Sequence, residues 1–478
     1  MCRIYFFGAG RKGRYWLSYL KNFGVLPAGF IDNNKDLYGS TYEDLPIYSP
    51  DSLKTCAFEF VVITCNDEER IYQQLLELGV EKRKIIVGLH SIRSHLLYYA
   101  AAAQSAAGRT AAKDENICSN IKILFDLQNG MVLGGVEAWS YELAGQLKMQ
   151  GFQGMYLTID TALPVCVDET YPIHAFQYKE YGKDFDRIQQ CVHVITQNLP
   201  CTIICNFPQY IFWAACTARG MYPDQVRILS VLHNDDQTYY EAYSLWQKYI
   251  DKCMVISSRM EEKILSYGMD KKRIGHISWQ TTCSADIERT WNKEGDPLRI
   301  GYAGRMTVTQ KRADLFPVLA AKMKERNLCF HMNLAGVGEY SKTLQRQMEE
   351  ENLQNEIVLV GYLDRQDIPH FWRKQDIMIS CSEWEGHSIS QSEAMAAGAV
   401  PVITDVSGAR DDVTDGYNGF VVPVGDMDAL VDRICYLYHH RDELERMGKR
   451  AHDTIYARQK DRNQAAYWDK LLKEVWES

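Results

Sequence analysis

The segment S-C-S-E-W-E-G-H-S-I-S-Q-S-E-A-M-A-A-G-A-V-P, from Ser380 to Pro401, decides the fold expected for this chain. An apolar run over 376–380 leads into it and is typical of a buried parallel strand. A loop follows, then a helix expected to begin near Ser388 and to end at Gly398. The run 400–403 resumes a strand. Together they predict a βαβ unit whose helix start offers backbone N–H groups and a positive dipole end to a phosphate.

Two carboxylates in this segment, Glu385 and Glu393, are separated by seven residues. The first falls in the loop and the second about one turn into the helix. Both can therefore face a single crevice at the carboxyl ends of the strands, which is where open α/β sheets bind ligands. The alternative is a pair of solvated charges, and the spacing alone does not decide between the two interpretations.

The stretch E-G-H-S-I-S-Q-S-E-A-M-A-A-G-A-V-P-V-I resembles the E-x7-E motif of retaining glycosyltransferases of the GT-B fold, family 4 in particular. The likeness runs through Gly386, the Glu-Ala-Met-Ala run at 393–396 and the exit at Pro401-Val402. His387 and Ser388 depart from the family's usual aromatic residue and Gly or Pro, which leaves the donor's identity open. The resemblance implies an α/β protein with two Rossmann-like domains facing a cleft, a nucleoside diphosphate sugar as donor, and retention of the anomeric configuration.

The resemblance covers about 119–478 and extends to a loop with two cations. The stretch 304–311 is similar to the family's G-R-x5-K loop, so Arg305 and Lys311 are expected to bind the donor diphosphate. A guanidinium fork and an ammonium can offset its negative charge and the charge that grows on the leaving group. Solvated surface charge is the alternative. The other residues that the resemblance places at the donor are Glu385 on the sugar hydroxyls, Ser388 and Ile389 at the diphosphate, and Glu393, Gly338, Tyr362 and Leu363 at the ribose and base.

Two features of the middle of the chain also resemble the family. Gly134 and Gly135 stand between a strand at 121–125 and a helix expected over 138–149, as in the family's G-G-x-E loop at the donor phosphates and acceptor. A simple tight turn is the alternative. His233 follows a strand expected at 227–232, and the family's matching histidine lies beside the donor sugar and acceptor. His233 and Glu385 are therefore the expected catalytic residues, although a lone histidine is more often structural.

Residues 1–100 predict a small Rossmann-like domain of roughly four strands. Gly8, Gly10 and Gly13 form G-x-G-x-x-G between a strand and a helix, and Asp32 ends the next strand, where an acid would hold a ribose. The segment resembles the small nucleotide-binding domain that precedes some bacterial sugar acyltransferases and glycosyltransferases. That likeness implies a nucleotide, dinucleotide or CoA-type ligand, and the alternative is a scaffold that binds none.

The expected organisation has five parts. They are the domain at 1–100, an Ala-rich helix and linker at 101–118, a GT-B N-terminal acceptor domain at 119–295, a GT-B C-terminal donor domain at 296–456, and a terminal helix at 457–478. That helix, with Trp468 and Val475 on its apolar face, is expected to pack back on the acceptor domain. The family's Pro-Asn-Gly is missing at 277–280, so no site is expected in that loop.

Composition narrows the class of protein. A net charge of -9 argues against a nucleic-acid partner, which would leave a basic footprint. There is no apolar run of about 18 residues and no room for a signal peptide before the first strand. The 14 cysteines show no zinc spacing and fall mostly in strand-like runs, where reduced cysteine is expected. A cytoplasmic protein is expected, and a location at the inner face of the membrane with peripheral contact stays open.

The sequence therefore predicts a retaining, hexosyltransferase-type glycosyltransferase (EC 2.4). It would move a sugar to a glycan, lipid-linked or other hydroxyl acceptor in cell-surface polysaccharide synthesis, with neither a cofactor nor a metal required for transfer. The alternatives are a non-catalytic sugar-nucleotide or dinucleotide sensor or scaffold working through the N-terminal domain, and a dinucleotide-dependent enzyme that uses Gly8–Gly13.

Overall fold

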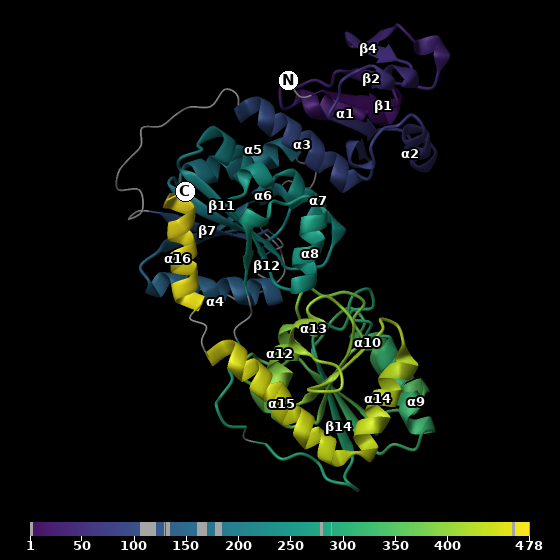
Figure 1. Ribbon diagram of the computed structural model, residues 1–478, viewed down its shortest axis with the longest axis vertical. Helices are drawn as coiled ribbons and strands as arrows, with labels where there is room; N and C mark the ends of the chain where they lie inside the picture. Colours follow the sequence, from purple (N-terminus) through teal and green to yellow (C-terminus); the bar gives the residue numbers. More distant parts are fainter. Residues whose placement is uncertain are drawn as a thin grey trace.

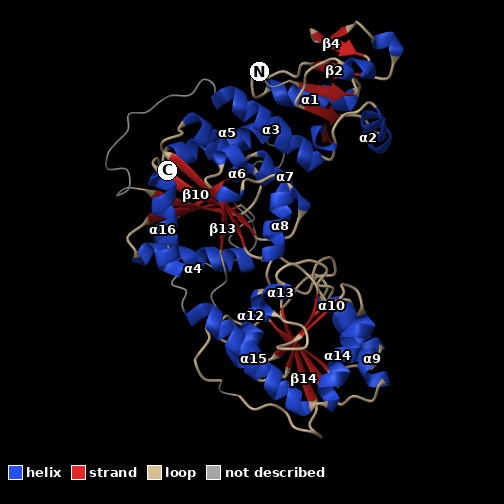
Figure 2. Cartoon of the chain, in the orientation of Figure 1, coloured by secondary structure: helices blue, strands red, loops and turns tan. Residues whose placement is uncertain are grey.

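The chain folds around three separate sheets, shown in a computed structural model (Figures 1 and 2). The structure describes residues 3–105, 121–128, 130, 134–159, 170–176, 184–277, 281–287, 289–460 and 464–477. Helices cover the sheets, as the α/β class predicted from the sequence requires. Within the described ranges, no helix combines the length and the apolar character that crossing a membrane would need.

The N-terminal sheet has six strands rather than the four predicted, in the order β3-β4-β2-β1-β5-β6. The strands β3 and β4 were not predicted, and they pair antiparallel to each other. β3 is only two residues long, and β4 contains Pro46, which argues against a strand. The strands are β1 (Ile4–Phe7), β2 (Gly29–Ile31), β3 (Thr41–Tyr42), β4 (Leu45–Tyr48), β5 (Phe60–Ile63) and β6 (Ile85–Ile86), and the helices are α1 (Arg11–Lys21), α2 (Glu68–Glu77) and α3 (Leu89–Ser105).

The middle sheet is entirely parallel, in the order β13-β12-β11-β10-β7-β8-β9. Its central strands β10 and β11 are buried along their whole length and mostly apolar, as expected of strands covered on both faces. The strands are β7 (Lys122–Leu127), β8 (Gln153–Ile159), β9 (Ile173–Phe176), β10 (Cys201–Cys205), β11 (Val226–Leu232), β12 (Lys252–Val255) and β13 (Ile274–His276). The helices are α4 (Gly135–Met149), α5 (Asp184–Thr196), α6 (Tyr210–Met221), α7 (Gln237–Leu245) and α8 (Ser258–Ser266).

The C-terminal sheet is also parallel, in the order β16-β15-β14-β17-β18-β19. The strands are β14 (Leu298–Ala303), β15 (Phe330–Ala335), β16 (Ile357–Gly361), β17 (Ile377–Ser380), β18 (Val400–Thr404) and β19 (Phe420–Val422). The helices are α9 (Leu315–Glu325), α10 (Ser341–Glu350), α11 (Ile368–Arg373), α12 (Ile389–Ala396), α13 (Ala409–Asp412), α14 (Met427–His439) and α15 (Arg441–Lys460). The predicted strand–loop–helix–strand unit is β17, α12 and β18.

Each sheet reverses its strand order at one point, and the loops there form natural ligand sites. In the middle sheet the reversal lies between β7 and β10, and in the C-terminal sheet between β14 and β17. In the N-terminal sheet it lies between β1 and β5. The glycine loops at 8–10 and 134–135 follow β1 and β7, Arg305 and Lys311 follow β14, and Glu385 follows β17, all at these points. His233 follows β11 and Gly338 follows β15, the neighbouring strands.

The N-terminal unit packs directly on the middle unit, because its last helix, α3, is part of the hydrophobic core of the middle unit. In Figure 1, α3 lies across α5, α6 and α7. Trp246 Nε1 donates to Ser94 Oγ of α3 at 3.1 Å, and the Tyr98 ring meets the Trp246 ring edge-on at 5.3 Å. Residues of both units form one continuous hydrophobic cluster. Of the Ala-rich helix and linker expected at 101–118, residues 101–105 form the end of α3, and 106–118 lie outside the described residues.

The chain returns to the middle sheet at its end, as expected. A final helix, α16 (Gln464–Glu477), lies beside α4 (Figure 1). Its buried face carries Trp468, Leu471, Leu472 and Val475, and Arg227 Nε donates to the Val475 carbonyl at 2.6 Å. The predicted start near residue 457 was wrong, because 441–460 form α15, whose apolar face belongs to the C-terminal core.

Candidate functional site

The loop after β17 holds Glu385 in a buried, charge-paired position. Only 6% of Glu385 is exposed. Its Oε1 accepts a hydrogen bond from Ser382 Oγ at 2.7 Å and lies 2.5 Å from Lys311 Nζ. The carboxylate and the ammonium that the sequence placed at the donor sugar and diphosphate are thus each other's partners here. An ion pair shared by two neighbouring loops can exchange partners when an anionic ligand enters.

The loop after β14 supplies the second expected cation. Arg305 Nη2 donates to Gln310 Oε1 at 2.9 Å, and Gln310 Nε2 donates in turn to the Trp384 carbonyl at 3.3 Å. Gln310 was not predicted, and it ties the cation loop to the Glu385 loop. A glutamine inside G-R-x5-K carries no sequence signal of that role.

The start of α12 faces the start of α4 across the two domains. Ser388 is the N-cap, and its Oγ accepts from the Gln391 amide at 3.3 Å. A Cβ added at Gly135 would lie 3.3 Å from Ile389 Cδ1. Gly135 is therefore the place where α4 approaches α12, and a larger residue there would press on the expected phosphate site. The predicted start of α4 at 138 was late, because the helix begins directly after Gly134, its N-cap.

Glu137, in the first turn of α4, is a buried carboxyl that the sequence did not single out. It is 5% exposed, and a Cβ at Gly134 would collide with its carboxylate. Burial raises its pKa, opposed by its own backbone N–H and by Arg305. Arg305 belongs to the opposite domain, so the two charged groups face each other across the boundary.

His233 reaches the same place from the middle sheet. It follows β11, and its Nε2 lies 2.8 Å from Asn206 Oδ1, while its ring meets Trp139 edge-on at 5.2 Å. A Cβ at Gly386 would collide with the His233 carbonyl, so the glycine lets the Glu385 loop close on this strand end. Burial lowers the pKa of His233 to about 3, and the ring is neutral near pH 7.

Further contacts hold the two domains together beside this point. Arg259 of α8 pairs with Asp405 at 2.7 Å, and Ser257 Oγ lies 2.8 Å from Ser407 Oγ. His387, the departure from the family's aromatic residue, lies 3.1 Å from Asp412. Although burial opposes it, His387 and Arg458 hold the pKa of Asp412 at about 2. His387 thus anchors the loop to the C-terminal helices.

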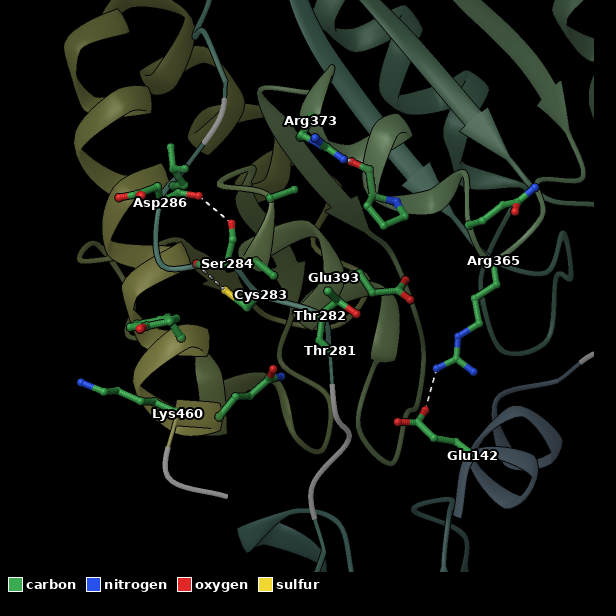
Figure 3. Close-up of a pocket in the computed structure, with 17 residues that line it drawn as sticks. Glu142, Thr281, Thr282, Cys283, Ser284, Asp286, Arg365, Arg373, Glu393 and Lys460 are labelled. Carbon is green, nitrogen blue, oxygen red and sulfur yellow. Dashed lines mark hydrogen bonds and ion pairs between the residues drawn. The ribbon is translucent and has the colours of Figure 1, made fainter. Parts of the chain in front are cut away.

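Glu393 opens onto a cavity of about 1010 Å³ (Figure 3). Burial raises its pKa to about 7, and Arg365 opposes that shift. Arg365 Nη2 lies 2.6 Å from Glu142 of α4, so an ion pair between the domains borders the cavity. Glu385 is not among the residues that line this cavity, and the expectation that both carboxylates face one ligand stays a prediction.

The connecting segment at 281–287 forms part of the cavity wall, which the sequence did not predict. Figure 3 shows Thr281 and Thr282 directly beside Glu393. Thr281 is 7% exposed, and its hydroxyl has no hydrogen-bond partner among the described atoms. The family's Pro-Asn-Gly is absent just before it, so no motif pointed there. Residues 278–280 themselves lie outside the described ranges.

The other residues expected at the nucleoside do not line the cavity. Gly338 packs against the Met306 carbonyl, where a Cβ would collide, and its amide donates a hydrogen bond to Ser341 Oγ at 3.0 Å. Tyr362 is exposed and Leu363 half-buried, on the loop that carries Arg365. Their roles at a nucleotide stay predictions.

The glycine loop of the N-terminal sheet is satisfied by its own domain. Asp32 Oδ2 accepts a hydrogen bond from the Ala9 amide at 2.8 Å. Gly8 has φ +117°, and a Cβ at Gly13 would strike the Gly8 carbonyl, which brings α1 close to β1. Gly10 is the N-cap of α1. These contacts account for the glycines structurally, and a ligand here stays a prediction. Among the described residues, no three His, Cys, Asp or Glu side chains gather as metal ligands would.

Known proteins are similar to this chain in sequence and in fold. Residues 284–454 match the family described as glycosyl transferases group 1, and residues 1–86 match the one described as C2185-like, N-terminal. HepE from Anabaena, solved with UDP and glucose, superposes with a TM-score of 0.58 at 16% identity, over 75% of this chain and 100% of that one. The protein therefore has the GT-B fold. Within that fold, residues 284–454 are similar to a glycosyl transferases group 1 domain.

Curated relatives are similar over shorter stretches. Poly(glycerol-phosphate) alpha-glucosyltransferase of Bacillus subtilis is 31% identical over 121 residues, which is 25% of this chain and 18% of that protein. The UDP-Gal:alpha-D-GlcNAc-diphosphoundecaprenol alpha-1,3-galactosyltransferase of Escherichia coli is 23% identical over 231 residues, 47% of this chain and 52% of that protein. The chain spans about half or less of the length of the curated relatives it matches first.

Proposed function

We propose that this chain is a glycosyltransferase that moves a sugar from a nucleoside diphosphate sugar to a hydroxyl acceptor, with retention of the anomeric configuration as in family 4. The observation that carries the proposal is the convergence of Lys311, Glu385 and the start of α12 beside the reversal point of the C-terminal sheet. His233 of the middle domain closes on the same loop. These groups are a cation, a carboxylate, the start of a helix and a neutral histidine. They come from different elements of the two domains and meet at one place.

In this proposal the donor diphosphate lies between the cation loop and α12. Arg305 and Lys311 offset its charge, and the first amides of α12 at Ser388 and Ile389 add backbone donors. As the bond to the sugar breaks, negative charge grows on the leaving phosphate, and these fixed donors stabilise it more than the ground state. No separate general base is assigned, since the leaving phosphate can take the acceptor proton.

The sugar and nucleoside would occupy the two sides of that diphosphate. Glu385, once Lys311 turns to the phosphates, accepts hydrogen bonds from sugar hydroxyls, and His233 lies beside the sugar. Glu393 accepts from the ribose hydroxyls inside the cavity of Figure 3. Gly338, Tyr362 and Leu363 would border the base, and Gly134 and Gly135 the acceptor side of the donor.

The acceptor class is proposed from the relatives. Their printed names include a poly(glycerol-phosphate) glucosyltransferase and a galactosyltransferase acting on a diphosphoundecaprenol-linked sugar. A glycan or lipid-linked acceptor in cell-surface polysaccharide synthesis is the corresponding proposal here, with the enzyme in the cytoplasm and in contact with the inner membrane face. A nucleotide, dinucleotide or CoA-type ligand at Gly8–Gly13 is a separate proposal, and it rests on the glycine loop and Asp32 alone.

A melting-temperature screen tests the donor. The purified protein is heated with UDP, GDP, ADP and CMP sugars, and with NAD and CoA. A ligand at about 100 times its Kd should stabilise the native state by about 2.7 kcal/mol. The screen is repeated on the Arg305→Ala/Lys311→Ala variant. The Lys322→Ala/Arg326→Ala variant is a matched control, because these cations pair with α14 in the same domain, away from the site.

The outcomes of this screen distinguish a glycosyltransferase from a sensor or scaffold that works through the N-terminal domain. A shift with one sugar nucleotide that the control keeps and the Arg305/Lys311 variant loses supports the transferase and names the donor. A shift by NAD or CoA alone, equal in all variants, would locate binding in the N-terminal domain and favour the sensor or scaffold. Transfer or hydrolysis from the labelled donor then distinguishes an enzyme from a protein that only binds it.

A further inference from the structure

The amide of Asn206 has an orientation that its surroundings decide. Asn206 follows β10 and is fully buried. Its Nδ2 donates to the Asp126 carbonyl at 2.8 Å and to Ser140 Oγ at 3.0 Å. A backbone carbonyl can only accept, so the nitrogen of the amide must face it. Ser140 agrees, because its hydroxyl donates to the Val136 carbonyl at 2.9 Å and is left to accept from Asn206.

The amide oxygen therefore faces the histidine. Asn206 Oδ1 lies 2.8 Å from His233 Nε2, and an amide oxygen can only accept. Nε2 must carry the proton of this bond. A neutral imidazole has one proton, so a neutral His233 ring bears its lone pair on Nδ1. The tautomer is set by the partner of the opposite nitrogen.

This arrangement is firmly held. Asp126, whose carbonyl orients the amide, accepts from the Gln128 amide at 3.0 Å and the Phe207 amide at 3.2 Å through its carboxylate. Tyr239 OH donates to the Asn206 carbonyl at 3.2 Å. The network joins the ends of β7 and β10, where the middle sheet reverses, to the strand end that carries His233. It thus reaches the loop of Glu385 and Gly386.

We infer that Asn206 is a positioning residue that fixes His233 as the Nε2–H tautomer, so that Nδ1 accepts a hydrogen bond from a substrate hydroxyl. The tautomer follows from the contacts alone, and only the hydroxyl partner rests on the proposed function. A histidine in the other tautomer would present N–H instead and would meet a hydroxyl only as a donor. Asn206 therefore decides which polarity the ring shows to the sugar and acceptor.

Nitrogen-15 NMR of the full chain labelled at histidine tests the tautomer. The His233 signals are assigned by their loss in His233→Gln. We expect Nε2 of the native protein to carry a directly bonded proton and Nδ1 to have the shift of an unprotonated nitrogen near pH 7. Asn206→Ala should mix the two tautomers. Ser140→Ala should leave them unchanged, because the Asp126 carbonyl still orients the amide.

Transfer from the donor found in the melting screen gives the second readout. We expect Asn206→Ala to lower kcat/KM about tenfold, the effect of one misdirected buried hydrogen bond, and Ser140→Ala to lower it about twofold at most. A native spectrum with the proton on Nδ1 overturns the inference, whether or not Asn206→Ala folds. An Asn206→Ala protein that folds with unchanged tautomer and rate also overturns it.

These outcomes are distinct from failure of the proposed function. If the native protein shows the Nε2–H tautomer but transfers no sugar, the positioning by Asn206 stands and the transferase does not. If transfer is observed and the tautomer is Nδ1–H, the transferase stands and the role given to Asn206 is wrong.

Discussion

Two loops of this molecule lead from a strand to the start of a helix, and a carboxylate is bound at each of them. The group that binds the carboxylate differs between the two loops. Before α1, the carboxylate of Asp32 is bound by the Ala9 amide of the glycine loop itself. Before α12, the carboxylate of Glu385 is bound by Lys311, a side chain from the loop after β14. The first arrangement ties a domain together, whereas the second brings two opposite charges to one point.

The difference shows what a sequence fingerprint does and does not establish. The backbone amide that holds Asp32 cannot leave, so that carboxylate already has a structural use. The ammonium of Lys311 sits on a flexible stem and can turn to a phosphate, which would release Glu385 to a sugar. The contacts of the G-x-G-x-x-G loop thus account for a helix packed closely on a strand, and a ligand there stays a prediction. At the Glu385 loop, charged side chains from two loops already meet.

The largest effect is expected from Glu385→Gln. Replacing the carboxylate by an amide removes the charged acceptor proposed for the sugar, and kcat should fall about a hundredfold or more with little change in melting temperature. Glu383→Gln is the matched control, because Glu383 lies in the same loop, is exposed and pairs with half-buried Arg312. A Glu385→Gln protein that transfers at the native rate would remove the distinction between the two loops.

Glu393 sharpens the comparison through pH. Its folded pKa of about 7 lies above its ordinary value of 4.5, so the folded state holds its proton more tightly than the unfolded chain. Stability from this group is therefore lost as pH rises from about 4.5 to 7. The carboxylate that would accept from a ribose forms as pH rises through 7. Calorimetry should show that UDP binds about tenfold more tightly about one pH unit above 7 than about one unit below it. The Glu393→Gln variant should lose this pH dependence.

A smaller effect is expected at the other loop. Asp32→Ala removes the acceptor of the Ala9 amide and should cost about 1 kcal/mol of unfolding free energy, measured by urea denaturation. Sugar transfer should be unchanged. The comparison would break if Asp32→Ala left stability intact and instead abolished binding of NAD or CoA, because Asp32 would then serve a ligand.

The smallest effect is expected from Glu142→Gln, which breaks the pair with Arg365 at the border of the Glu393 cavity. Arg365 is 65% exposed, and exposed ion pairs contribute less than about 1 kcal/mol. UDP affinity should change about twofold at most, and the change should shrink further in high salt. A tenfold change at any salt concentration would mean that the pair controls access to the cavity.

Much of the fold could be predicted because the strands are short apolar runs that only a doubly covered parallel sheet accommodates. The strands β14, β17 and β18 and the helix α12 lie where the sequence predicted them. The strand β4 was missed because Pro46 interrupts its apolar run. The start of α16 was misplaced because 457–460 continue α15. Local patterns do not say which core an amphipathic helix joins.

The residues of the candidate site also fall into two groups, those that sequence motifs predicted and those that only tertiary contacts reveal. Arg305, Lys311, Glu385 and Glu393 stand in motifs whose spacing is visible in one dimension, and those motifs predicted them. Thr281 and Gln310 carry no such signal, since each gains its place from a neighbour far away in the chain. Glu137 stands in the G-G-x-E stretch, but its burial and its position opposite Arg305 are visible only in the structure. Their relevance depends on packing between loops, which no local spacing encodes.

The sequence by itself determined the GT-B class and the residues of its motifs, because strand periodicity and the glycine and charge spacing are properties of consecutive residues. Only the tertiary structure decided that Lys311 pairs with Glu385 and that Asp32 is held by its own loop. It also decided that Asn206 orients His233. The physical reason is that hydrogen-bond and ion-pair partners are chosen by distance in space, and folding brings together groups that lie 23 to 74 residues apart.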